Sequence, residues 1–121
     1  MRSMAKSILV LITKSPYGLE DAFAGLRLAL AMGVNGMSTS VLMIEDGVYN
    51  AVSTQKPEAV GMPSNIEATK ELYDFDAPVY VLKEDLASRS ISEKKLFDGL
   101  KLVEAVEVKK LLAEHDLVTT F

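Results

Sequence analysis

The stretch Ala22-Phe-Ala-Gly-Leu-Arg-Leu-Ala-Leu-Ala-Met32 decides the fold, because its eleven residues contain a single charge, Arg27. Glu20 and Asp21 precede it, and carboxylates in a first turn complement the helix dipole, so we expect a helix here. A helix that is apolar all round must be buried all round. One sheet covers only one side of such a helix. We therefore expect a second partner, most simply another subunit, on the side turned away from the sheet.

The segments around this helix alternate between strand and helix patterns. The run from Ser7 to Thr13 is continuously apolar and rich in β-branched residues, which is typical of a strand buried on both faces of a parallel sheet. Strands that alternate with helices favour right-handed crossovers and helices on both faces of the sheet. We predict one α/β domain over residues 1–121, with three α/β/α layers and a five-stranded, mostly parallel sheet whose last strand is buried. The expected strands are 7–13, 39–44, 78–82, 102–106 and 117–121; the expected helices are 20–32, 65–73 and 107–115; helical turns are expected at 48–52 and 92–97, and 84–90 is a loop or a short helix.

The composition excludes several classes of protein. The 121 residues contain no cysteine, which excludes disulfides, thiolate metal sites and cysteine nucleophiles. His115 is the only histidine, so a multi-histidine metal site cannot form within one chain. The net charge of -4 argues against a nucleic-acid surface. Because no apolar run approaches the ~20 residues of a membrane span and no signal-peptide pattern is present, we expect a cytoplasmic protein.

Three loops follow the expected strands at the edge where open parallel sheets bind ligands. The loop from Lys14 to Gly18 is only loosely similar to a phosphate-binding loop, because it lacks a run of glycines. Acidic residues in the other two loops form either a rim for a hard cation or solvated turns. Neither a metal nor a cofactor is expected. The candidate binding residues are Lys14, Ser15, Tyr17, Glu45, Asp46 and Lys83, and the acidic rim would add Glu84 and Asp85.

Four residues of the first helix are candidates for a subunit interface: Phe23, Arg27, Leu28 and Ala31. Arg27 either pairs with an acid across that interface or extends its head into solvent.

The segment Ile12-Thr-Lys-Ser-Pro-Tyr-Gly-Leu-Glu-Asp-Ala-Phe-Ala-Gly-Leu-Arg-Leu-Ala-Leu-Ala-Met32, followed by Val41-Leu-Met-Ile-Glu-Asp-Gly-Val48, resembles the DsrE/DsrF-like family. Within the family it is most similar to the DsrF/TusC branch. A weaker match continues through Lys83-Glu-Asp-Leu86 and ends with Leu117-Val-Thr-Thr-Phe121, so the resemblance spans nearly the whole chain.

This resemblance implies a DsrEFH-like domain, of the flavodoxin-like or Rossmann-like type, that assembles into trimers or hexamers. It also implies a role in sulfur relay, where relatives pass persulfide sulfur toward thiolation of transfer RNA or within dissimilatory sulfur metabolism. In the DsrE/TusD branch a cysteine near the end of the third strand carries the sulfur. Here that region is Tyr80-Val-Leu-Lys-Glu-Asp-Leu-Ala87, without a thiol. Subunits of the DsrF/TusC branch likewise lack this cysteine.

Three hypotheses follow. The first is a non-catalytic accessory subunit that scaffolds a paralogue with a reactive cysteine. The second is a self-associating protein that binds a nucleotide or an anion at the loops of Tyr17, Glu45 and Lys83. The third, an enzyme that acts through carboxylates and a metal, lacks a convincing set of residues.

Overall fold

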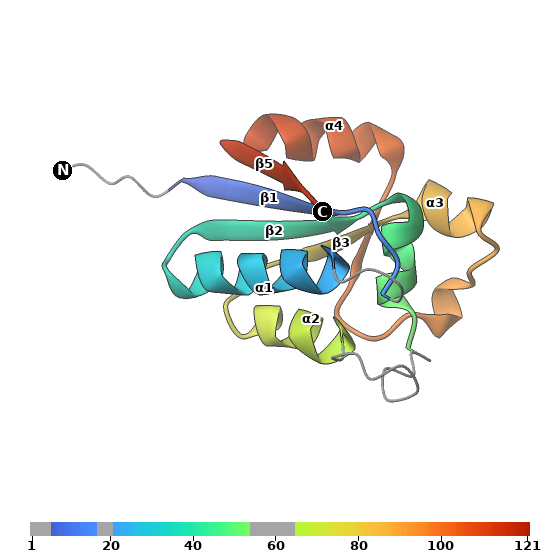
Figure 1. Cartoon of the computed structure of the whole chain (residues 1–121). Coiled ribbons are helices and arrows are strands. Elements are labelled where there is room, and N and C mark those ends of the chain that lie inside the picture. The colour runs from blue at the N-terminus through green and yellow to red at the C-terminus, as the bar shows by residue number, and fades with distance from the viewer. Residues whose placement is uncertain (1–5, 17–20, 54–64) are drawn as a thin grey trace.

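Five parallel strands form one sheet in the order β4-β3-β2-β1-β5. The computed structural model, drawn in Figure 1, describes residues 6–16, 21–53 and 65–121. The predicted α/β fold with a five-stranded parallel sheet is confirmed. Its strands are β1 (Ser7–Ile12), β2 (Ser38–Met43), β3 (Val79–Leu82), β4 (Lys101–Val103) and β5 (Leu117–Thr120); its helices are α1 (Asp21–Val34), α2 (Asn65–Tyr73), α3 (Lys83–Ser88) and α4 (Ala105–Glu114), with the 3-10 turns η1 (Glu45–Ala51) and η3 (Glu93–Lys95).

Helices cover both faces of this sheet. α1 and α2 lie side by side on one face, and α4 lies on the other (Figure 1). The chain moves across the sheet from β1 to β4 and then returns to place β5 beside β1. Because crossovers between parallel strands are right-handed, this reversal puts α4 on the face opposite α1.

The side chains of β1 explain why its sequence is continuously apolar. Ile8, Val10 and Ile12 join the core beneath α1, whereas Leu9 joins the core beneath α4. Successive side chains of a strand point to opposite faces, so a strand covered on both faces needs apolar residues at every position.

The boundary between β4 and α4 differs from the expected one. A strand over 102–106 and a helix from 107 were expected, but β4 ends at Val103 and α4 begins at Ala105. Glu104 is the N-cap residue, and it forms a capping box with Glu107, whose side chain accepts the Glu104 N–H at 3.0 Å. These reciprocal bonds satisfy main-chain donors that the first turn leaves unpaired, so the helix starts before its apolar stripe.

The prediction that the last strand is buried is wrong. β5 is an edge strand bonded to β1 alone, and Leu117 and Val118 are 47% and 44% exposed. The alternation of helices and strands predicts that a strand occurs here, but it does not determine the position of that strand in the sheet.

The second partner expected for the first helix lies partly within the same chain. α2 packs along one side of α1 and contributes Ala68 and Leu72 to the same core. Ala24, Arg27 and Ala31 of α1 are exposed. In a single chain the outer side of this helix is therefore uncovered, and its burial by another subunit stays a prediction. In the part of the chain that the structure describes, no helix is long and apolar enough to cross a bilayer.

Candidate functional site

The order of the strands reverses between β1 and β5. Beyond their carboxyl ends lies the crevice where open α/β sheets bind ligands. Phe121 lies at this end of the sheet and is bonded to the loop after β1. Its carbonyl oxygen accepts hydrogen bonds from the N–H of Thr13 at 2.8 Å and from the Thr13 hydroxyl at 2.6 Å. Its ring packs against α1 at Gly25, beneath the helix.

The loop after β1 is held by a residue that the sequence analysis missed. The side-chain amide of Asn50 is buried and donates to the carbonyl oxygens of Lys14 and Gly47, each at 2.9 Å. Lys14 itself is exposed and Ser15 is half-buried. The predicted binding residue Tyr17 lies outside the described residues. An asparagine within a helical turn was the only signal in the sequence, because side chains of this type often bond to nearby main chain.

The acidic residues after β2 take part in a clamp, formed by Asp46, Asp85 and Arg89, between η1 and α3. Arg89 donates from Nε to Asp46 Oδ1 at 3.0 Å, and its Nη1 lies 3.8 Å from Asp85 Oδ1. Asp85 also accepts the N–H of Glu45 at 2.5 Å. Glu45 has a positive φ of 53°, a conformation that side chains rarely adopt and that this bond helps to hold. The clamp ties η1 to α3.

Three of the four carboxylates of the predicted acidic rim therefore bond to other parts of the chain. Asp46 and Asp85 bind Arg89, and Glu84 accepts two hydrogen bonds from the N–H of Ala105, at 2.9 and 3.1 Å, at the start of α4. Among residues 6–16, 21–53 and 65–121, no group of three His, Cys, Asp or Glu side chains is arranged to hold a metal ion.

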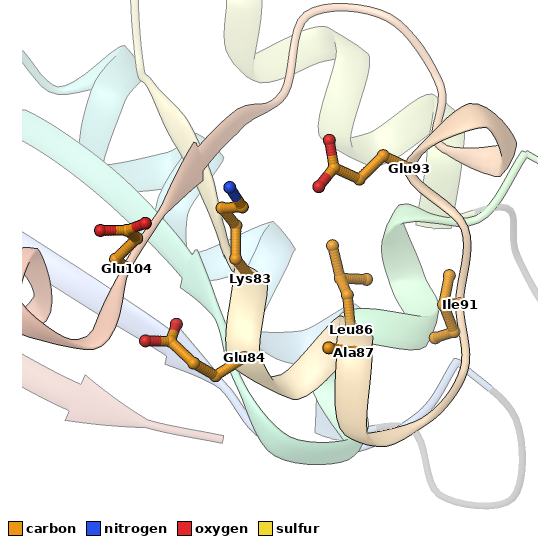
Figure 2. Close-up of a pocket in the computed structure, with 7 residues that line it drawn as sticks. All are labelled: Lys83, Glu84, Leu86, Ala87, Ile91, Glu93 and Glu104. Carbon is orange, nitrogen blue, oxygen red and sulfur yellow. The ribbon is translucent and has the colours of Figure 1, made fainter.

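Lys83 lies in a shallow cavity of about 300 Å³ beyond the end of β3. Figure 2 shows its ammonium group extending between the carboxylates of Glu93 and Glu104, with Leu86 and Ile91 as apolar neighbours. Three carboxylates line the cavity together with this one lysine. The local charge therefore does not favour an anionic ligand, although Lys83 was predicted to hold one.

The four predicted interface residues lie on two adjoining surfaces of α1, and Arg27 belongs to both. Phe23 and Arg27 line a groove of about 340 Å³ between α1 and α2, where the guanidinium carbon lies 5.7 Å from the centre of the Phe23 ring. Leu28 is half-buried and Ala31 is exposed. Together with their neighbours they make the outer face of α1, which consists of Ala24, Arg27, Leu28, Ala31 and Val34. This face carries one charge among small or apolar side chains.

Comparison with known proteins agrees with this geometry. A family model described as the DsrE/DsrF-like family matches residues 6–121. The chain is 34% identical to an uncharacterised protein of Methanocaldococcus jannaschii over 93% of this chain and 96% of that protein. It is also 25% identical to the intracellular sulfur oxidation protein DsrF of Allochromatium vinosum, over the full length of both, and 27% identical to the protein TusC of Buchnera aphidicola, over 96% of this chain and 99% of TusC.

A solved structure shares the same architecture. The crystal structure of the YchN protein from Escherichia coli aligns with a TM-score of 0.85 and 28% identity, covering 96% of this chain and 99% of YchN. The family model covers nearly the whole chain, and the parallel sheet and its helices match a relative of similar length. This protein therefore belongs to the DsrE/DsrF-like family.

Proposed function

We propose that this protein is a non-catalytic accessory subunit of a cytoplasmic sulfur-relay assembly, which uses the outer face of α1 to bind a paralogue with a reactive cysteine. One observation carries the proposal: the chain resembles DsrF and TusC over its whole length and contains no cysteine. Persulfide transfer needs a nucleophilic sulfur, and the thioether of methionine cannot provide one. The assembly would serve thiolation of transfer RNA or dissimilatory sulfur metabolism.

The outer face of α1 supports the second part of the proposal. Ala24 and Ala31 are exposed small residues about two helical turns apart, so a neighbouring element can approach the helix closely at these two positions. Arg27 is the only charged residue on this face. An interface that covers the face therefore has to remove only one charge from water. Val34 is 60% exposed, and a permanent interface would bury such apolar area.

Co-expression with a paralogue that carries a cysteine tests the proposal. Native mass spectrometry is expected to show a mixed trimer or hexamer of fixed ratio. In a persulfide-transfer assay the paralogue, and not this chain, should carry the sulfur label, and addition of this chain should raise the transfer rate.

Two acidic substitutions test the surface itself. Leu28→Glu should release this chain from the mixed oligomer, because it places a charge in an apolar contact. Val106→Glu is the matched control, since Val106 is a 72% exposed apolar residue of α4 on the opposite face of the sheet. Circular dichroism would confirm that both variants fold. Failure to form a mixed oligomer, or an unchanged mass for Leu28→Glu, would contradict the proposal; a nucleotide retained by the purified chain would favour the small-ligand hypothesis instead.

A further inference from the structure

The outer edge of β5 has unpaired main-chain groups. Phe121 makes both of its main-chain bonds toward β1: its N–H donates to Leu11 at 2.8 Å, and its carbonyl accepts from Thr13 at 2.8 Å. Main-chain groups of successive residues in a strand point to opposite sides. The N–H and carbonyl groups of Val118 and Thr120 therefore point away from β1, and among the described residues none is bonded to them.

This edge also lacks the features by which proteins protect exposed strands. Lysines, prolines and bulges commonly block edge strands, but Leu117-Val-Thr-Thr-Phe121 contains no charged side chain and no proline. Leu117 pairs with Ile8 and lies on the α1 face of the sheet, whereas Val118 pairs with Leu9 and lies on the α4 face. Apolar surface is thus exposed on both faces beside the unpaired groups. The opposite edge is different, because β4 has only three residues and starts with the exposed Lys101.

We propose that β5 pairs with β5 of a second copy of this chain, antiparallel and about a two-fold axis perpendicular to the sheet, so that the two sheets become continuous. A two-fold interface must be complementary to itself, and an uncharged edge strand meets this condition without repulsion between like charges. The corresponding contact at β4 would bring a Lys101 side chain of each copy into the interface.

The outward main-chain groups of Val118 and Thr120 determine which residues of the two β5 strands lie opposite each other. If Thr119 lies on the axis, Val118 of each copy bonds with Thr120 of the other, and all the outward main-chain groups of these residues become paired. Leu117 then lies opposite Phe121 of the second copy. Both residues are on the α1 face, so the exposed leucine meets an aromatic ring.

Two substitutions of Thr120 provide a matched test. Thr120→Pro removes an N–H that points away from β1, so it should leave the pairing with β1 intact. Thr120→Val keeps that N–H and removes only the hydroxyl. Analytical ultracentrifugation of the purified chain should show a dimer for the natural sequence and for Thr120→Val. For Thr120→Pro the dissociation constant should rise about thirty-fold, because each dimer loses two hydrogen bonds.

A second pair of variants covers the case in which the proline variant does not fold. Val118→Lys places a charge at the contact and should dissociate the dimer, whereas Val118→Thr should not. Hydrogen exchange gives an independent readout: the amides of Val118 and Thr120 should become protected as the protein concentration rises.

The inference does not depend on the proposed function. A chain that is monomeric at high concentration, or a dimer that resists both Thr120→Pro and Val118→Lys, would overturn it. A homodimer that Leu28→Glu dissociates while the β5 variants do not would also overturn it, and would leave the proposed role of α1 in place. Conversely, loss of the mixed assembly with an intact β5 dimer would contradict only the proposed function.

Discussion

Thr13 donates two hydrogen bonds to the carbonyl oxygen of Phe121, one from its N–H at 2.8 Å and one from its hydroxyl at 2.6 Å. The two residues are 108 positions apart in the sequence. This contact joins the edge strand to the loop after β1 and keeps the Phe121 ring beneath α1. The carboxyl ends of β1 and β5 are thereby tied together.

Replacing Thr13 tests how much this contact stabilises the protein. Thr13→Val keeps the shape of the side chain and removes the hydroxyl donor. Because the main-chain bond remains, we expect the free energy of unfolding in urea to fall by about 1 kcal/mol. Thr120→Val is the control, since Thr120 is exposed, and its effect should stay within about 0.5 kcal/mol. An equal loss for the two variants would contradict a stabilising hydrogen bond from the Thr13 hydroxyl to Phe121.

Two glycines of α1 test the packing of Phe121. A Cβ at Gly25 would lie 2.5 Å from Ile12 Cδ1 and 2.9 Å from Phe121 Cγ. Overpacking costs about 1–3 kcal/mol, which exceeds the ~1 kcal/mol that alanine gains over glycine in a helix, so Gly25→Ala should lower the melting temperature.

Gly33→Ala is the matched control for that substitution. A Cβ at Gly33 would meet Phe75 at 3.5 Å, an ordinary contact distance. We therefore expect the same substitution, in the same helix, to leave the melting temperature unchanged or to raise it. A rise for Gly25→Ala would show that the space beneath α1 is not filled as described.

The sequence predicts most of the fold because most of its signals are local. The apolar runs of β1 and α1 and the acidic first turn of α1 each lie within one element, so they identify the α/β class without knowledge of contacts. The edge position of β5 depends instead on which strand β5 pairs with, and nothing within residues 117–121 specifies that partner. The start of α4 was missed because Glu104 and Glu107 act through capping, whereas the expected boundary relied on apolar periodicity.

The candidate site was predicted less well for the same reason. Glu45 and Asp46 were correctly placed at the carboxyl end of a strand, but their interactions with Asp85 and Arg89 cross some forty positions of sequence. Arg89 carries no pattern that singles it out before the two loops are brought together.

A double-mutant cycle on Arg89 and Asp46 tests the clamp. Their side chains are 24% and 63% exposed, so water weakens the attraction, and we expect a coupling free energy of about 0.5 kcal/mol that decreases as salt is added. Urea unfolding of Arg89→Ala, Asp46→Ala and the double variant would measure it. The single Arg89 variant should cost more than the Asp46 variant, because Arg89 also donates to the Asp85 carbonyl and the Ser88 hydroxyl. Zero coupling at low salt would contradict the clamp.

From the environment of Tyr73 we predict that the free energy of unfolding falls at alkaline pH. Burial raises the pKa of its phenol above the ordinary value of 10.0, and the nearby Asp98 carboxylate raises it further. Below pH 10 the group is protonated in both the folded and the unfolded chain, so it adds no pH dependence. Above pH 10 the unfolded chain loses this proton first, and the free energy of unfolding falls until the pH exceeds the folded pKa.

Spectrophotometric titration of the tyrosines can isolate this group. Tyr73→Phe should remove the phenol that titrates late and flatten the alkaline part of the stability profile, at the expense of its hydrogen bond to the Asp98 carbonyl at 3.2 Å. Asp98→Asn should lower the pKa of Tyr73 only in part, because burial is the larger cause. If the late titration persists in Tyr73→Phe, another phenol is responsible and the environment described for Tyr73 is wrong.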